Sequence, residues 1–457
     1  MKKISVLLLA LLFYTTAKAQ QQAPEPEKFT LKEAIDFGLK QNYVVQNSEL
    51  QSDLSDAQKG EVRANLLPQI AANADLIHSF NVQQNITESG IGFQANSPLP
   101  KGTPIAFQLG LKNTFTPNIT GSQVLFDQAF FSAQGAATAN QEIAEKSITK
   151  TKIDIAVNIT KAYYSVLVNE KQLEAVQSNL ASLDSVYKET TARYESGIAR
   201  NIDVSRTLVS LNNVREQQQE VIRLVSLSRS ILRYQMNASE KNPLILTDSL
   251  HPGMVTEIES ILNNQDKKII YSNRIEYSII ESQLKYNSYL TKNAKAGHYP
   301  RLLAIGSFGY NPGATNFSDL TQSARWYDYS TIGLRLQVPI FSGLAVNYRV
   351  QQKQIQQQIT ENNKRLLEKE INLEVDQAII NLYNSVQSFR IQRENLTLAE
   401  DNLAVLRAEF EAGLVLNVEV TTAESDLIEA QTNFYRAVFA ALVSKADYEK
   451  ATGTILK

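Results

Sequence analysis

Apolar residues in the second half of the chain recur at intervals of three and four, the pattern of a helix that packs in a coiled coil. The positions are Val375, Ile379, Leu382, Val386, Phe389, Leu396, Ala399, Leu403, Leu406 and Phe410. Neither Pro nor Gly occurs between 344 and 411, so we predict one continuous helix after Gly343. At 1.5 Å per residue this helix would be about 100 Å long, more than a compact domain needs.

The same register occurs 216 positions earlier, with polar residues at two of the matching positions. These positions are Ile159, Tyr163, Val166, Glu170, Leu173, Leu180, Leu183, Tyr187, Thr190 and Tyr194. The agreement predicts an internal two-fold repeat. We divide the chain into a leader (1–19), a first repeat (20–237), a linking segment (238–256) and a second repeat (257–457).

Each long helix is expected to end in a similar turn, YESGIARNIDV at 194–204 and FEAGLVLNVEV at 410–420. Gly197 and Gly413 can adopt the left-handed conformation that closes a helix. An Asn and an acid follow each Gly after four and six residues, and they suit the positive first turn of a second helix. The pairs are Asn201 with Asp203 and Asn417 with Glu419. We therefore predict antiparallel helical hairpins, with return helices over about 201–236 and 417–451.

A shorter helix is predicted ahead of each strand region. Thr30 can cap a helix that starts at Leu31, is interrupted near 41–42 and ends before Pro68. Proline ends it because it disfavours the helical conformation in the residue before it. A matching helix is expected over about 257–297, ahead of Pro300.

After each of these prolines the period changes from helical to alternating, which predicts strand pairs over 69–126 and 301–341. In the second repeat Ile332, Leu334, Leu336, Val338 and Ile340 alternate with Gly333, Arg335 and Gln337. In the first repeat Ile105, Phe107, Leu109 and Leu111 alternate with Ala106, Gln108, Gly110 and Lys112. Each strand then has one oily and one wet face. Alone, this alternation favours a soluble β-sandwich over a membrane barrel, whose signal per segment is weak.

Composition restricts the possible locations and chemistry. Lys2 and Lys3, an apolar run over 4–13 and Ala17-Lys18-Ala19 predict a secretory signal peptide and an exported protein. Its removal takes away three lysines and leaves 42 basic against 47 acidic residues, a net charge of −5, which speaks against a nucleic-acid partner. The chain has no Cys, hence no disulfide. No later stretch reaches about 18 consecutive apolar residues, so any membrane contact is expected through strands.

Two strand pairs give four strands in each chain, which is too few to close a barrel. The smallest membrane barrels close with about eight strands, and an open edge in lipid leaves backbone groups unpaired. If the strands face lipid, several copies must contribute to one barrel. The long helices would then form a cylinder as well.

With its duplicated motifs in this order, the chain resembles the TolC family of outer-membrane efflux and secretion channels over the whole mature sequence. The residues that carry the resemblance are Leu66-Leu67-Pro68, Tyr299-Pro300, Val124-Leu125-Phe126-Asp127, Val338-Pro339-Ile340-Phe341-Ser342-Gly343, Ala162-Tyr163-Tyr164 and the two turns. The resemblance implies a membrane α+β fold, in which a homotrimer forms a twelve-stranded outer-membrane β-barrel above a periplasmic α-helical barrel. It also implies a passive exit duct whose tips meet a periplasmic adaptor (membrane fusion protein) and an inner-membrane pump of RND or ABC type.

The resemblance further implies that acids at Asp203 and Glu419 lie near the periplasmic entrance. The sequence departs from the family pattern here, because Glu419 replaces an Asp and Thr422 and Val415 stand where a second acid and a gating Arg can occur. Arg200 and Arg206 are possible substitutes for that Arg. An acid in a first helical turn is equally expected simply to complement the helix dipole.

Exposed apolar residues at the end of a coiled coil are costly unless a partner covers them. The expected adaptor contact is therefore Gly197, Ile198, Ala199, Gly413, Leu414 and Val415.

No residue pattern predicts catalysis, a cofactor or a metal site. His78, His251 and His298 are scattered without metal-ligand spacing, and neither a phosphate-binding loop nor a nucleophile motif is present. We expect a protein that is not an enzyme. The alternative to a duct is a periplasmic or surface coiled-coil scaffold, such as an adhesin, with a soluble β-domain. The transported substrate is not predictable from these motifs.

Overall fold

A computed structural model of the chain describes residues 27–89, 98–108, 110–240, 242–250, 253, 258, 271–321 and 326–455. The expected signal peptide, His251 and several positions at the end of the linking segment lie outside the described residues. Two compact units are formed. The first, here called the helical unit, takes described residues from 1–53, 143–281 and 362–457, and the second, the sheet unit, from 54–142 and 282–361. Each unit draws on both predicted repeats.

The first helices follow from local sequence. Helix α2 (Leu31–Gln41) starts with a capping box, in which the Thr30 hydroxyl accepts from the Glu33 N–H and the Glu33 carboxylate accepts from the Thr30 N–H. The expected interruption is confirmed at Asn42, whose backbone is extended and whose side chain accepts from Val44 N–H. Helix α3 (Tyr43–Ala64) follows and ends ahead of Pro68.

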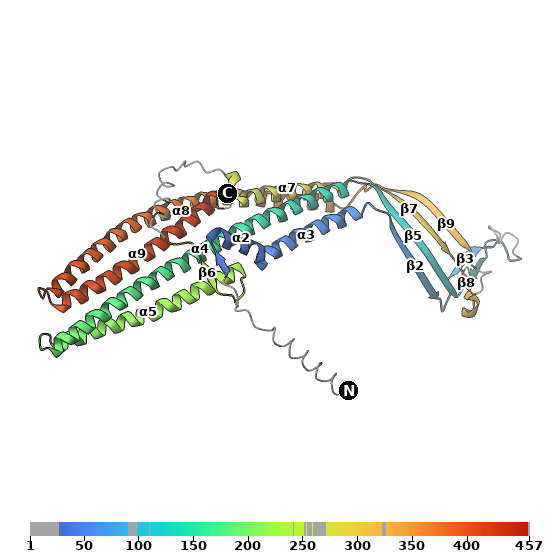
Figure 1. Cartoon of the computed structure of the whole chain (residues 1–457). Coiled ribbons are helices and arrows are strands. Elements are labelled where there is room, and N and C mark those ends of the chain that lie inside the picture. The colour runs from blue at the N-terminus through green and yellow to red at the C-terminus, as the bar shows by residue number, and fades with distance from the viewer. Residues whose placement is uncertain are drawn as a thin grey trace, which may run out of the picture. The chain divides into compact units, whose positions relative to one another are not determined.

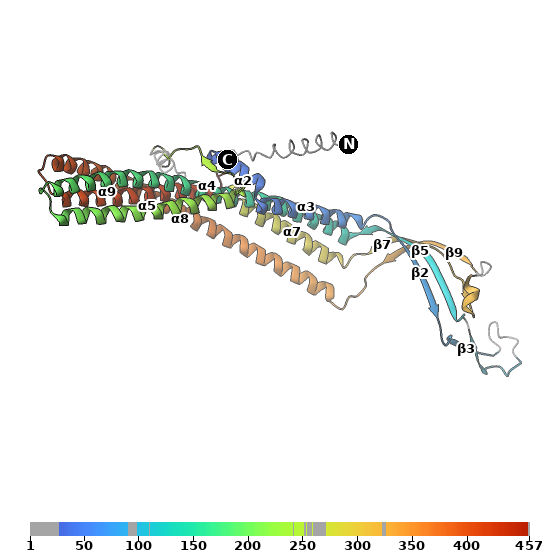
Figure 2. The ribbon, with the colours of Figure 1, turned by 60° about the horizontal axis from the view of Figure 1, so that its bottom comes forward.

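Two very long helices dominate the chain, α4 (Gln128–Glu195) and α8 (Ala345–Glu411). Each is followed by a return helix, α5 (Asn201–Met236) and α9 (Asn417–Thr452), as the sequence predicts. In Figure 1 α4 lies beside α5 and α8 beside α9, and Figure 2 shows the four hairpin helices overlapping in a turned view. Ahead of α8, a short 3-10 turn, η2 (Tyr271–Asn273), leads into α7 (Ile275–Ala296). The earlier part of the helix expected over 257–297 lies largely outside the described residues.

The predicted heptad positions form the core of the helical unit. Most of the seam is buried or packed against buried clusters, including Tyr163, Leu183, Leu382, Phe389 and Phe410. The polar seam residue Glu170 instead forms an ion pair of 2.7 Å with Arg229 of α5. The buried Tyr163 hydroxyl of α4 donates a hydrogen bond to the Asp248 carboxylate at 2.9 Å. The short strands β1 (Glu27–Phe29) and β6 (Leu244–Leu246) pair in parallel next to this contact.

The sheet unit holds an antiparallel sheet in the order β2 (Gln69–His78), β5 (Asn113–Asp127), β7 (Arg301–Tyr310) and β9 (Asp328–Gln337). Short β8 (Gly313–Ala314) pairs with the outer end of β5 and precedes the 3-10 helix η3 (Phe317–Thr321). Central β5 and β7 pair with each other, so each half of the chain contributes two neighbouring strands.

One strand expectation is wrong. The alternation over 105–111 does not belong to the main sheet, because β4 (Pro104–Gln108) pairs only with β3 (Gln84–Glu88) in a separate hairpin. Gly110, at a φ of 133°, interrupts the extended chain before β5 begins at Asn113. Leu111 and Lys112 lie outside any strand, and Leu109 lies outside the described residues.

The strand register places mostly apolar residues on one face of the main sheet and most of its polar residues on the other. Opposed positions on one face are apolar: Ile70, Ala72, Ala74 and Leu76 on β2, Phe115, Pro117 and Ile119 on β5, Leu302, Ala304 and Phe308 on β7, and Ile332, Leu334 and Leu336 on β9. The other face, here called the polar face, carries Asn73, Asp75, Asn118, Thr120, Ser122, Ser307, Thr331 and Arg335, together with the apolar Ile77, Leu303 and Ile305. The apolar face is uncovered, since Ile332 is 94% and Leu334 70% exposed.

Candidate functional site

The two hairpin turns have the same backbone geometry. Gly197 and Gly413 adopt φ angles of 75° and 77°, in the left-handed region that Gly enters without strain. In each turn the N–H after the Gly donates back across the helix end, from Ile198 to Arg193 and from Leu414 to Glu409, both at 2.8 Å. These are the closing bonds of a Schellman-type helix end. The turn geometry expected from the sequence is thus confirmed.

The side chains of the two turns differ. Asp203 accepts from the guanidinium of Arg200 through both carboxylate oxygens, at 3.0 and 3.1 Å, and from the Arg200 N–H at 3.2 Å. These hydrogen bonds from Arg200 lower the pKa of Asp203, and the positive charge of Arg200 compensates the negative charge of its carboxylate. Arg206 adds only long-range attraction to Asp203. At the matching position of the second turn, Glu419 is exposed. The N-cap residue of α9 is Leu416, whose side chain cannot accept a hydrogen bond from the start of the helix.

The second turn is bonded to the first hairpin through Asn417. Its buried amide donates to the Thr207 hydroxyl at 2.6 Å and to the Asp203 carbonyl at 3.3 Å. The Thr207 hydroxyl itself donates to the Asp203 carbonyl at 2.9 Å. The sequence pattern predicts only that Asn417 starts a helix, and it does not predict the contact with Thr207. Its counterpart Asn201 is exposed, so the two repeats use the same residue differently.

Further along the hairpins, the buried Glu424 of α9 accepts from Ser182 of α4 at 2.8 Å and from Arg407 of α8. Its second carboxylate oxygen is buried without a hydrogen-bond partner. Burial raises the pKa of Glu424, against the opposing effects of Ser182 and Arg407. Asn179 of α4 also donates to Gln431 of α9, at 2.7 Å. Moving the hairpins apart would therefore break several buried polar contacts.

The expected tip residues are not equally accessible. Ile198 is 75% and Leu414 76% exposed, whereas Val415 packs against the cluster that holds Phe410. Between the hairpins a groove of about 470 Å³ is lined by Ile202, Ser205, Arg206, Val209, Ser210, Thr421, Thr422 and Ser425. The turns thus present two large apolar side chains beside a groove rich in hydroxyl groups.

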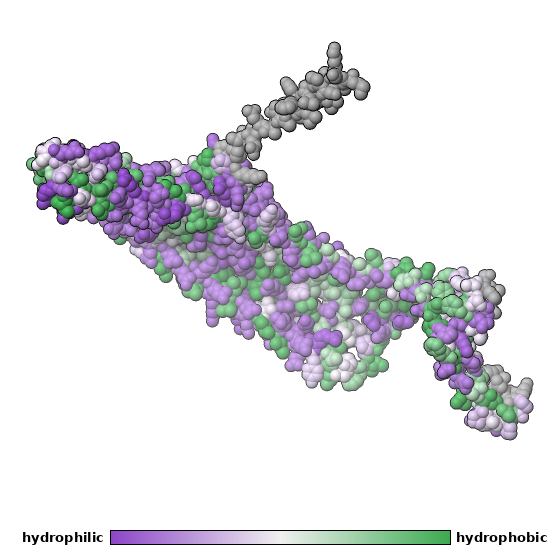
Figure 3. Space-filling model, turned by 90° about the horizontal axis from the view of Figure 1, so that it is seen from below, coloured by the Kyte–Doolittle hydropathy of each residue, from purple (hydrophilic) through white to green (hydrophobic). Residues whose placement is uncertain are grey.

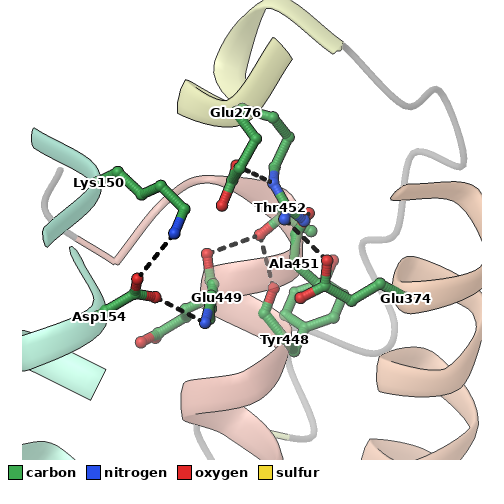
Figure 4. Close-up of polar contacts among 10 residues, drawn as sticks. Lys150, Asp154, Glu276, Glu374, Tyr448, Glu449, Ala451 and Thr452 are labelled. Carbon is green, nitrogen blue, oxygen red and sulfur yellow. Dashed lines mark hydrogen bonds and ion pairs between the residues drawn. The ribbon is translucent and has the colours of Figure 1, made fainter. Parts of the chain in front are cut away.

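A second polar cluster ties α9 to α4, α7 and α8 (Figure 4). Buried Arg274 donates to Glu276 at 3.1 Å, to Glu374 at 2.8 Å and to the Ala451 carbonyl at 2.8 Å. Lys450 pairs with Asp154 of α4 at 2.8 Å. The guanidinium of Arg274 uses all three nitrogens, so the start of α7, the middle of α8 and the last turn of α9 are joined. This cluster is structural, and no pattern of residues predicted it.

The histidine among the described strands, His78, has polar and aromatic neighbours rather than metal ligands. His78 lies 2.6 Å from the Asn113 side-chain oxygen and stacks edge-on with Phe80. Across the described ranges, no group of three or more His, Cys, Asp or Glu residues is arranged to hold a metal ion. Within the same ranges, no helix combines the length and apolarity needed to cross a membrane.

Solved structures of outer-membrane channels have the same fold. The fold matches a crystal structure of CusC with a TM-score of 0.72 at 15% identity, covering 93% of this chain and 92% of that one. It also matches the Campylobacter jejuni CmeC outer membrane channel, with a TM-score of 0.71 at 14% identity over 93% and 85% of the two chains. At such low identity, these matches show the fold.

The family is shown by the sequence profile described as "Outer membrane efflux protein", which matches residues 35–226 and 281–454. The chain belongs to this family, and it is an outer-membrane protein with a large periplasmic portion. Similar proteins include the outer membrane protein TolC of Salmonella enteritidis, 22% identical over 90% of this chain and 80% of the relative. The proteases secretion protein PrtF of Dickeya chrysanthemi is 20% identical over 100% of this chain and 93% of the relative. The expected membership of the TolC family is confirmed.

Proposed function

We propose that the protein is an exit duct of the outer membrane, through which an efflux pump or a type I secretion system passively discharges its cargo. The observation that carries this function is the main sheet. Its apolar face is uncovered, and its edge strands β2 and β9 each pair on one side only in the part of the chain that the structure describes. Such a sheet suits lipid on one face and water on the other, provided that further strands close it.

The further strands would come from identical copies of the chain. An exposed apolar stripe on the helices also supports contacts between copies. Helix α8 carries a second apolar stripe, separate from the buried seam, at Leu366, Leu373, Ile380, Ile391, Leu398 and Val405. The steps of 7, 7, 11, 7 and 7 keep it on one side of the helix, and each residue is more than half exposed. Figure 3 shows apolar residues at the surface of the helices among hydrophilic ones. A coiled-coil contact with a neighbouring copy would bury this stripe.

We infer a homotrimer, because three copies of a four-stranded sheet give the twelve strands that the family resemblance implies. The internal two-fold repeat is part of this proposal: α4 with α5 and α8 with α9 would alternate around one helical tube. In this arrangement the polar sheet face and the inner helix surfaces line a continuous water-filled path. Transport then needs no covalent chemistry in the chain, and we propose a conduit rather than an enzyme.

The hairpin turns are the proposed contact with a periplasmic adaptor and its inner-membrane pump. Ile198 and Leu414 are large apolar residues exposed to water, as expected for a surface that a partner covers. The similar proteins include one named for protease secretion and others named TolC, so the proposal keeps both pump classes, RND and ABC. The proposed entrance residues are Asp203, Glu419, Arg200 and Arg206, at the same turns.

The deciding experiment combines fractionation with conductance. The full-length protein should be extracted from outer membranes by detergent as a trimer and should give discrete single-channel steps in planar bilayers. A second test uses the variant Leu373→Glu/Leu398→Glu on the exposed stripe of α8. It should reduce the trimer yield because it places charges in the proposed subunit contact. A soluble monomer without conductance would instead favour the coiled-coil scaffold with a soluble β-domain.

A further inference from the structure

Two arginines lie close together on the polar face of the main sheet, at the end where β7 begins and β9 ends. Arg301 begins β7 opposite Gln337 of β9, and Arg335 of β9 lies opposite Leu303 of β7. The two arginines are therefore diagonal neighbours on adjacent strands, within reach of each other's side chains. Their positive charges act on the same small area of the sheet.

Neither arginine forms an ion pair in the ranges that the structure describes. Arg301 donates two hydrogen bonds, from Nε at 2.9 Å and from Nη2 at 2.6 Å, and both go to the neutral side-chain amide oxygen of Gln337. Arg335 is exposed, and in the ranges that the structure describes its guanidinium forms no hydrogen bond or ion pair. Like charges at diagonal positions on neighbouring strands repel each other.

Of the acids on the same strands, one lies close to the arginines and another lies far from them. Asp127, opposite Arg301 on β5, accepts from the Ala129 N–H at 2.8 Å and so caps the start of α4. Asp75 of β2 pairs with Thr116, which is six residues from Ser122 along β5, or about 20 Å in an extended strand. Two arginines against the single carboxylate of Asp127 leave this end of the polar face net positive.

The surroundings of Arg335 suit a solute. A hollow of about 550 Å³ on the sheet is lined by Arg335 together with the hydroxyl groups of Thr120, Ser122, Ser307 and Thr331. Hydroxyl groups can turn their hydrogens toward an anion, and a guanidinium supplies a charge and a planar set of donors. Carboxylate, phosphate and sulfate groups accept such hydrogen bonds.

We propose that this arginine pair makes the strand portion of the duct selective for anions, and that the cargo bears carboxylate, phosphate or sulfate groups. The inference rests on the proposed duct, because only there does the polar face line the path. Each copy around the tube would add both arginines at one level, so that their fields add along the axis. At the hairpin turns, by contrast, Asp203 is compensated by Arg200, so that of the two acids there only the exposed Glu419 opposes anions.

The test is the reversal potential of single channels under a KCl gradient. The parent protein should favour chloride over potassium. Arg301→Gln/Arg335→Gln should lower the chloride-to-potassium permeability ratio on the order of threefold to tenfold, the size expected from a few screened charges. Arg301→Lys/Arg335→Lys keeps the charges and should keep the ratio within about twofold of the parent. Citrate, as a multivalent anion, should block the parent more strongly than the glutamine variant.

The outcomes separate this inference from the duct itself. A conducting parent whose selectivity and citrate block are the same as in the glutamine variant would overturn the inference and leave the duct standing. A parent without conductance would remove both. If the double variant assembles poorly, Arg335→Gln alone is the test, because this guanidinium holds no hydrogen bond among the described residues. An unchanged ratio in that variant, at parental trimer yield, would also overturn the inference.

Discussion

The side-chain amide of Asn417 donates a 2.6 Å hydrogen bond to the hydroxyl of Thr207, a residue 210 positions earlier in the chain. The contact joins the first turn of α9 to the first turns of α5, and both side chains are buried. It lies close to the exposed turns where we place the adaptor contact. Separation of the two hairpins at this end must break it, so it should hold the entrance of the duct closed.

Asn417→Ala should loosen this end of the hairpins. Loss of a buried hydrogen-bond partner costs about 1–3 kcal/mol, because the remaining polar groups stay desolvated. We expect a lower melting temperature and more frequent open states in single-channel recordings. The matched control is Asn201→Ala, which removes the same side chain from the exposed counterpart position. Equal effects of the two substitutions would show that the Asn417 contact does not restrain the hairpins.

The apolar sheet face should tolerate charge poorly. Leu334 is 70% exposed on this face, and a cationic side chain near the bilayer midplane costs roughly 2–4 kcal/mol. Leu334→Arg should therefore reduce the amount of assembled protein in the outer membrane. The control is Thr331→Arg, a charge on the polar face of the same strand, which should assemble. The assay is the yield of detergent-extracted trimer, and similar yields for both variants would reject the assigned orientation.

The local elements were predictable because their signals are local. Gly197 and Gly413 end their helices for a conformational reason that is visible in the sequence, and the heptad seam specifies the buried side of α4 and α8. The alternation over 105–111 shows the limit of such signals. Period two identifies an extended segment but does not name its partner, and β4 pairs with β3 rather than joining the main sheet.

The contacts that matter for the proposed function depend on long-range placement. Asn417 with Thr207, Glu424 with Ser182 and Arg301 with Gln337 each join different helices or strands. No periodicity fixes how two hairpins lie against each other, so these pairs could not be derived from the sequence. The Arg200–Asp203 pair was accessible because the two residues are three positions apart at a helix start.

The exposed turns should carry the adaptor contact. Ile198→Asp/Leu414→Asp replaces two apolar side chains that are about three-quarters exposed, and it should abolish crosslinking to the adaptor. Trimer yield should be unaffected because neither residue belongs to a buried cluster among the described residues. Val415→Ala is an informative control, since Val415 packs inward. Normal crosslinking of the aspartate variant would place the adaptor elsewhere on the duct.

Glu424 should make the stability of the helical unit depend on pH. Burial raises its pKa above the ordinary carboxyl value of 4.5, so the folded state prefers the protonated form. Its contribution to stability is therefore complete below pH 4.5 and is lost as the pH rises through the raised pKa. The melting temperature of Glu424→Gln, relative to the parent, should rise from pH 4 to pH 7. Glu429→Gln, on the exposed side of the same helix, reports the effect of removing a surface charge. A flat difference between Glu424→Gln and the parent would contradict the assigned burial effect.

The two acids at the entrance should contribute unequally to ion selection. Asp203 is held by Arg200 in a bidentate pair, whereas Glu419 is exposed and accepts no hydrogen bond in the described part of the chain. If both face the path, three copies of Glu419 form the ring with uncompensated charge, and such a ring attracts cations. Glu419→Gln should therefore weaken block by multivalent cations from the periplasmic side more than Asp203→Asn does. Arg200→Gln should strengthen that block, because it frees the Asp203 carboxylate. Single-channel recordings with Mg²⁺ or a trivalent cation measure this order. If none of the three variants changes the block, the acids only stabilise the starts of their helices.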